Sequence, residues 1–260
     1  MTELVTLDVE KGVGILRFTQ PKRRNPYSLV FVGQLVAALK SVEDDDSVRA
    51  VVMTGGDHFS SGGDLVGFRT EIAKGTRATQ QLLDTANTGT RAAFNFPKPL
   101  ISAVSGVCYG GGMSLALCGD MIVAAKDARF CQVFSKIGGV PDTGSSWLLQ
   151  QRISAAAARQ LVFTGREISG QEAHDMGLVE ESVPAGQTEE IAIALAQEIA
   201  ANPLFALISA KRVMRETAET GFEQALQIEG RAQNIMMNAH DFPEAMEAFT
   251  QKRKPRFNDR

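Results

Sequence analysis

Residues 141–147 read PDTGSSW and carry the clearest catalytic motif of the chain. Asp-Thr-Gly-Ser is how an aspartic peptidase presents one of its two catalytic carboxylates. Asp142 could be half of such a dyad, a catalytic carboxylate of another kind, or a residue that caps a helix starting near Thr143 or Gly144. A dyad needs two carboxylates that share a proton. No other Asp-Thr-Gly or Asp-Ser-Gly occurs, and the residues after the motif have a helical pattern, so we reject the peptidase.

Other nucleophile and metal motifs are absent. The chain has no G-x-S-x-G, no G-x-x-x-x-G-K-[ST] and no H-E-x-x-H. The three histidines are His58, His174 and His240, and the three cysteines are Cys108, Cys118 and Cys131. The cysteines form no C-x-x-C and have no histidine at ligand spacing, which predicts no metal site and free buried thiols in a reducing compartment.

Two glycine clusters could do chemistry through the backbone. HFSSGGDL follows the apolar run RAVVMTG, and GVCYGGGMSLAL follows LISAV. Glycine ahead of a helix frees backbone N–H groups and lets an anion approach closely. Each cluster alone could be a tight turn. Together they could direct two amides at one oxygen atom and form an oxyanion hole.

The elements that must position these residues alternate along the first three-quarters of the chain. LVTLDVE and VGILRFTQ flank Lys11-Gly12 and predict a hairpin. Ser28 is expected to cap a helix. RAVVMTG and PKPLISAV are continuous apolar runs, which predict strands buried on both faces, and DMIVAAKDARFCQ predicts two more strands. Residues 66–90 are weakly patterned and are expected to be helical and mobile.

Helices dominate after Ser145, and the last of them are amphipathic with surplus apolar surface. Such a surface needs a partner, either the chain's own core or another subunit. The 260 residues are 44% hydrophobic and 22% charged with a net charge of −3, so we expect no nucleic-acid partner. No uninterrupted apolar run reaches the ~20 residues of a membrane span. The start is not a signal peptide, and we expect a cytoplasmic protein.

Six ordered segments resemble the enoyl-CoA hydratase/isomerase (crotonase) superfamily over nearly the whole chain. They are PKRRNPYS, HFSSGGDL, GVCYGGGMSLALCGDMIVAA, ARFCQVFSKIGGVPDTGSSWLLQQRI, LVFTGREISGQEAHDMGLVEESVP and AFTQKRKPRF. The resemblance implies an α/β fold of the ClpP/crotonase type. It implies a spiral of ββα units over residues 1–200 that holds the acyl-CoA site. A helical trimerisation region over residues 201–260 would build a homotrimer or a dimer of trimers.

The same resemblance assigns roles to particular residues. The amides of Gly63 and Gly111 would hold the thioester oxygen as it becomes an enolate. The coenzyme A part of the substrate would lie along a set of binding residues: Arg23, Arg24, Asp64, Leu65 and Lys252. Adenine would lie near Asp64 and Leu65, and Lys252 would meet the 3′-phosphate. No cofactor is required, because coenzyme A enters as the carrier of the acyl substrate.

The chain departs from the hydratases of this superfamily. They activate water with two glutamates, and here those places hold Ser114 and Phe134, neither of which can replace a carboxylate. FSKIGGVPDTGSSWLL resembles the 2-(1,2-epoxy-1,2-dihydrophenyl)acetyl-CoA isomerases and related enoyl-CoA isomerases, in which an aspartate at the place of Asp142 is catalytic. A dehalogenase branch also has this aspartate, but it needs a histidine where this chain has Asn87.

We therefore expect an acyl-CoA isomerase of fatty-acid or phenylacetate metabolism that shifts a double bond or opens an epoxide. Val140, Pro141, Phe134 and Trp147 should raise the pKa of Asp142 by excluding water, and Ser114, Phe134 and Trp147 should line the substrate pocket. Three alternatives remain open: an acyl-CoA-binding homologue without turnover, a hydratase or lyase, and a dehalogenase. The capping role of Asp142 also remains open.

Overall fold

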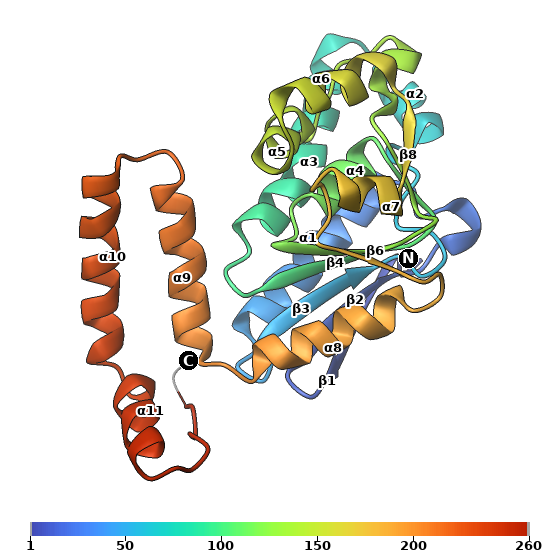
Figure 1. Ribbon diagram of the computed structural model, residues 1–260. Coiled ribbons are helices and arrows are strands. Elements are labelled where there is room, and N and C mark those ends of the chain that lie inside the picture. Colours follow the sequence, from blue (N-terminus) through green and yellow to red (C-terminus); the bar gives the residue numbers. More distant parts are fainter. Residues whose placement is uncertain (1, 259–260) are drawn as a thin grey trace.

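A computed structural model describes residues 2–258 (Figure 1). The chain begins with the predicted hairpin of β1 (Val5–Glu10) and β2 (Val13–Phe18), which pair antiparallel. Lys11 and Gly12 between them have φ angles of 50° and 81°. Two left-handed residues make the tight turn that matches the twist of the strands.

The large sheet has the strand order β1-β2-β3-β4-β6-β9 and is parallel from β2 onward. Its further strands are β3 (Ala50–Thr54), β4 (Leu100–Val104), β6 (Met121–Ala125) and β9 (Glu181–Val183). Every residue of β3 and β4 is buried, as the two apolar runs predicted. A parallel sheet covered on both faces explains why these strands show no alternation.

A second, three-stranded sheet lies beside the first. It consists of β5 (Val107–Tyr109), β7 (Arg129–Cys131) and β8 (Glu167–Ser169), with β5 parallel and β8 antiparallel to β7. The sequence predicted β7 but neither β5 nor β8, because three residues are too few to show a period. Since β4 and β5 belong to different sheets, the chain steps from the large sheet to the small one between them, and it does so again between β6 and β7.

Helices cover both faces of the large sheet. The helices of the first half are α1 (Leu29–Asp44), α2 (Leu65–Ile72), α3 (Thr76–Asn95) and α4 (Gly111–Ala116). Ser28 caps α1 as expected, its Oγ accepting the Phe31 N–H at 3.2 Å. Along β3, Ala50 and Val52 pack with the buried alanines of α8 (Thr188–Ala200). Val51 and Met53 point to the other face and pack with α1 and α3.

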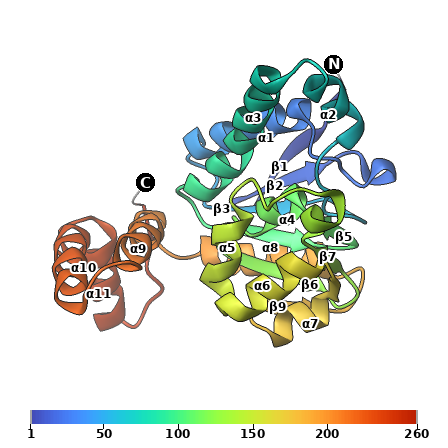
Figure 2. The same cartoon turned by 90° about the horizontal axis from the view of Figure 1, so that it is seen from above.

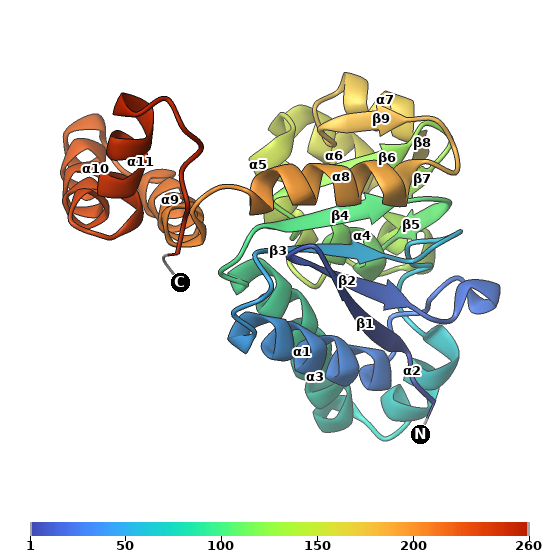
Figure 3. The ribbon, with the colours of Figure 1, turned by 90° about the horizontal axis from the view of Figure 1, so that it is seen from below.

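The second half contributes α5 (Ser145–Arg152), α6 (Ala155–Thr164) and α7 (Gly170–Asp175). After α8 the chain turns by 104° into α9 (Leu204–Thr217), followed by α10 (Phe222–Met237) and α11 (Asp241–Thr250). Figures 2 and 3 show these last three helices standing away from the two sheets. The division of the chain at residue 200 stays a prediction.

Contacts of Lys211 and Arg215 tie α9 to the rest of the chain. Lys211 Nζ lies 2.6 Å from Asp120 Oδ2, and the Arg215 guanidinium lies 4.5 Å from the centre of the Phe94 ring. The outer surface of the three helices keeps large apolar side chains in solvent, among them Met214, Phe222, Met246 and Phe249. In residues 2–258 no single helix is long and apolar enough to cross a bilayer. The bent pair α8–α9 passes that test by length and composition only.

Candidate active site

Asp142 lies in the loop between a short 3₁₀ helix (Val133–Ile137) and α5. Burial raises the pKa of its carboxyl group, and a hydrogen bond from Thr143 Oγ1, 3.2 Å from Asp142 Oδ1, opposes the rise. The capping role is wrong. Helix α5 has Gly144 as its N-cap and no side-chain cap. Asp142 supports the helix start only through its carbonyl oxygen, which accepts the Ser145 N–H at 3.0 Å.

Thr143 has a backbone conformation that is rare for its type. Its φ is +49° and its side chain is 6% exposed. A β-branched residue in the left-handed region is strained, and such strain persists only where the surroundings enforce it. A Cβ placed on Gly111 would lie 3.6 Å from Thr143 Oγ1. The strained residue therefore brings the Asp142 loop against the start of α4.

The two glycine clusters lie side by side. The Ser60 N–H donates to the Val107 carbonyl oxygen at 3.0 Å, and the Tyr109 N–H donates back to the Ser60 carbonyl oxygen at 3.0 Å. One step further, Gly62 has a φ of +84°, and a Cβ there would lie 2.7 Å from Tyr109 O and 3.6 Å from Gly111 N. Only glycine fits at that position, because any side chain would push the two loops apart.

The amides of Gly63 and Gly111 donate no backbone hydrogen bond within residues 2–258. Gly63 pairs with Tyr27, but the bonds of that pairing run through the neighbouring residues Gly62 and Asp64. Gly111 is the first residue of α4, and first-turn N–H groups have no partner inside a helix. Two adjacent loops thus leave two N–H groups available close to the Asp142 loop.

Ser114 and Phe134, the residues that the sequence comparison predicts at the places of the hydratase glutamates, both border this site. Ser114 is fully buried, and its Oγ lies 3.3 Å from the carbonyl oxygens of Gly110 and Asp142. Phe134 is 8% exposed, and its ring would lie 3.6 Å from a Cβ on Gly110. Neither side chain can exchange a proton near neutral pH, whereas the carboxyl group of Asp142, whose backbone carbonyl oxygen contacts Ser114, can.

Two of the residues expected to bury Asp142 do not do so. Val140 is 77% exposed. Trp147 is 45% exposed and packs edge-on against Phe94, with ring centroids 5.5 Å apart. That contact belongs to a groove of about 930 Å³ between α9 and the core. The prediction that Val140 and Trp147 shield the carboxylate is therefore wrong in its details, although the raised pKa is confirmed in direction.

The residues expected to bind coenzyme A fall into two groups. Arg23, Arg24, Asp64 and Leu65 lie together beside Gly63. Arg23 Nη2 lies 3.7 Å from Asp64 Oδ1, and the Arg24 carbonyl oxygen accepts the Ser61 N–H at 2.7 Å. Leu65 is 59% exposed, so an apolar surface is open next to this ion pair.

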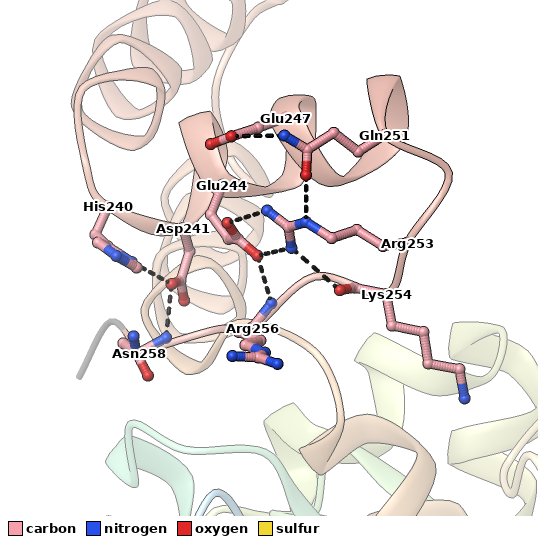
Figure 4. A network of polar contacts seen from close by, with 9 residues as sticks. All are labelled: His240, Asp241, Glu244, Glu247, Gln251, Arg253, Lys254, Arg256 and Asn258. Carbon is pink, nitrogen blue, oxygen red and sulfur yellow. Dashed lines mark hydrogen bonds and ion pairs between the residues drawn. The ribbon is translucent and has the colours of Figure 1, made fainter.

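Lys252 lies far from that group within the chain. It is exposed and closely follows α11, and Figures 1–3 show α11 and α2 at opposite ends of the molecule. Its neighbour Arg253 is engaged elsewhere, because its guanidinium donates to both carboxylate oxygens of Glu244 at 2.6 and 2.9 Å (Figure 4). This contact lowers the pKa of Glu244 to about 2. The tail is thus folded back on α11.

In residues 2–258 no group of three His, Cys, Asp or Glu side chains is arranged to hold a metal ion. The three cysteines are free and buried, as the sequence predicted.

The enoyl-CoA hydratase/isomerase family model matches residues 8–260. The chain belongs to this family. It is 33% identical over 259 residues to the 1,2-epoxyphenylacetyl-CoA isomerase of Escherichia coli, with 99% of both chains covered. It is 32% identical to the 2,3-dehydroadipyl-CoA hydratase of the same organism over the full length of both. A crystal structure of an enoyl-CoA hydratase from Polaromonas superposes with a TM-score of 0.93 at 30% identity, covering 98% of this chain and 99% of that one.

These similarities confirm that the chain has the crotonase fold and is an enzyme of the enoyl-CoA hydratase/isomerase family. An acyl-CoA substrate is consistent with this family. The related proteins carry both isomerase and hydratase names. Sequence reasoning missed two residues that border the site of this family member, Tyr27 and Thr143. A threonine in the sequence PDTGS gives no signal of its left-handed backbone, and Tyr27 in PKRRNPYS gives none of its burial.

Proposed function

We propose that this protein is an acyl-CoA isomerase that moves a double bond in a CoA thioester, with Asp142 as its proton-transfer group. The proposal is supported by the raised pKa of the Asp142 carboxyl group and by the contact between Thr143 and the start of α4, where the Gly111 amide has no backbone partner. A raised pKa suits a group that must both take and return a proton near neutral pH.

The reaction follows from that arrangement. With a 3-enoyl thioester, the Asp142 carboxylate removes a proton from the carbon next to the carbonyl. The electrons pass into the thioester oxygen and form a dienolate. The N–H groups of Gly63 and Gly111 hold that oxygen, each donor of this kind being worth roughly 2.7–4 kcal/mol. The carboxyl then returns its proton to the far carbon of the dienolate, which leaves the conjugated 2-enoyl thioester.

Further parts of the proposal concern binding and assembly. Arg23, Arg24, Asp64 and Leu65 would hold coenzyme A beside Gly63. The groove between α9 and the core and the apolar surface of α9–α11 would be covered in a homotrimer or a dimer of trimers. Lys252 would then reach the 3′-phosphate bound to a neighbouring subunit. No cofactor would be needed, and a cytoplasmic location would suit the free thiols.

The test is an absorbance assay with a 3-enoyl-CoA, because conjugation of the thioester in the product adds ultraviolet absorption to that of the adenine ring, which substrate and product share. Appearance of the added absorption supports the isomerase. Binding of the thioester without any absorbance change would instead favour a binding protein without turnover. Loss of absorption from a 2-enoyl-CoA would show addition of water across its double bond, and the protein would then be a hydratase. Release of halide from a haloaroyl-CoA would identify a dehalogenase.

A further inference from the structure

Tyr27 lies against the first glycine loop, and its side chain is 2% exposed. Its backbone N–H donates to the Gly62 carbonyl oxygen at 2.8 Å, and its carbonyl oxygen accepts the Asp64 N–H at 3.4 Å. These two bonds hold the residues on both sides of Gly63. The backbone of Tyr27 therefore fixes the direction in which the Gly63 amide points.

The ring of the same residue lies against the second glycine loop. A Cβ on Gly111 would lie 3.8 Å from Cδ1 and 3.9 Å from Cγ of Tyr27, which is ordinary van der Waals contact. On its other side the ring packs against Phe31, with centroids 5.6 Å apart. One residue thus bridges the two loops that carry the free amides, with its backbone at the first loop and its ring at the second.

The hydroxyl group anchors this side chain on α3. Tyr27 Oη donates to the Ala86 carbonyl oxygen at 2.9 Å. Gly89 lies one turn further along α3. A methyl group there would lie 2.4 Å from Tyr27 Oη, so the tyrosine hydroxyl fills the space that this glycine leaves. Burial raises the pKa of the phenol, with smaller contributions from Cys118 and then Asp142, and this keeps it a neutral donor.

We propose that Tyr27 is a positioning residue that sets the separation of the Gly63 and Gly111 amides, with its hydroxyl fixing both against α3. The inference rests on the proposed function, because it takes these amides to hold the thioester oxygen. Two donors on separate loops act together only when their spacing is fixed, and a misplacement of ~1 Å can cost ~10²-fold in rate.

Two substitutions test the anchor from opposite sides. Tyr27→Phe removes the hydroxyl and keeps the ring. Gly89→Ala keeps the hydroxyl but inserts a methyl group into its place, which should push the ring toward Gly111. In the Tyr27→Phe background the same methyl group meets no hydroxyl, so the two effects should not add. Tyr109→Phe is the matched control, since it removes the hydroxyl of the only other tyrosine, which bonds Glu167.

Two measurements report on the amides themselves. The first is the division of the effect between kcat and KM with a 3-enoyl-CoA. The second is the absorption of a bound arylacryloyl-CoA, which moves to longer wavelength when its carbonyl oxygen accepts strong hydrogen bonds. We expect Tyr27→Phe and Gly89→Ala each to lower kcat by roughly 10–100-fold. We also expect a smaller wavelength shift, KM within about threefold of wild type, and a cooperative thermal transition.

A Tyr27→Phe protein with the full wavelength shift and a kcat within about twofold of wild type overturns the inference. The inference is also overturned if the unfolded fraction of the Tyr27→Phe protein accounts for its whole loss of kcat. The proposed function fails separately: wild-type protein that shifts the bound chromophore but forms no product refutes the isomerase and leaves the role of Tyr27 standing. Wild-type protein that binds the thioester without any wavelength shift refutes both.

Discussion

Replacing Asp142 by asparagine removes one proton-exchange site and keeps most of its contacts. Ser114 and Ser145 donate hydrogen bonds to its backbone carbonyl oxygen, which is present whatever the side chain at position 142. Thr143 Oγ1 donates to Oδ1, and an asparagine oxygen in the same place can accept that bond. The free amides at Gly111 and in the neighbouring loop belong to other parts of the chain. The substitution therefore isolates proton transfer from shape.

The expected loss is that of a general acid/base. Such groups contribute typically 10²–10⁴-fold, which at 1.36 kcal/mol per tenfold is about 2.7–5.4 kcal/mol of transition-state stabilisation. The loss should fall on kcat, while KM for the 3-enoyl-CoA stays close to the wild-type value. The matched control is Asp175→Asn on α7, whose exposed carboxylate accepts a bond from Gln171.

The same substitution should not destabilise the fold. Burial raises the pKa of Asp142 above its ordinary value of 3.8, so the folded state binds this proton more tightly than the unfolded state. The stability linked to this proton is present below pH 3.8 and is lost as the pH rises through the folded-state pKa. At pH 7 the ionised carboxylate is therefore a cost, which asparagine does not carry.

Activity and melting temperature should consequently move in opposite directions. Near neutral pH, Asp142→Asn should melt at or above the wild-type temperature while its kcat collapses, and the difference in melting should shrink on acidification. Absorbance kinetics and calorimetry on the same samples measure both. A variant that keeps more than about half the native kcat ends the proposed mechanism. A lower melting temperature at pH 7 would contradict the account of the raised pKa.

Four further outcomes are expected. Thr143→Val removes the bond that lowers the pKa of the neighbouring carboxyl, so the acidic limb of the kcat/KM profile should move to higher pH; an unmoved limb contradicts this. Gly62→Ala places a methyl group 2.7 Å from Tyr109 O at a φ of +84°, which should cost about 1–3 kcal/mol of unfolding free energy, measured by urea titration. Phe249, which is 87% exposed in the single chain, is expected at a subunit contact, so Phe249→Glu should reduce the mass measured by light scattering. A wild-type protein that is monomeric in this measurement would contradict the predicted trimer. Lys252→Ala should raise KM for a CoA thioester and leave the corresponding pantetheine thioester unaffected, and equal effects on both would exclude a phosphate contact.

The fold was predictable where the sequence pattern is local. The hairpin rests on two adjacent residues, Lys11 and Gly12, that accept left-handed backbone. The central strands are apolar throughout because both faces are covered, and Ser28 marks the start of α1. The three-residue strands β5 and β8 could not be predicted, because their pairing comes from distant segments and no period fits into three residues.

The sequence predicted which residues form the candidate site, but it did not predict which side chains surround them. Resemblance to the family pointed to Gly63, Gly111 and Asp142, and the structure brings their loops together. The neighbours of Asp142 were not foreseen, because proximity in the chain was taken for proximity in space. Trp147 follows Asp142 closely, yet its ring packs on Phe94. Tertiary contact, which a single sequence does not state, decides such cases.

Three features of the site cost stability, and of these the sequence missed only the strained threonine. A strained threonine, a partly buried carboxyl with a raised pKa, and two amides without backbone partners meet within one small volume. Folding alone selects against each of them, since strain, desolvation and unpaired donors all disfavour the native state. Their coincidence is expected where proton transfer is the selected property, because local rules are broken at functional sites and compensated elsewhere. The melting behaviour of Asp142→Asn measures one of these costs directly.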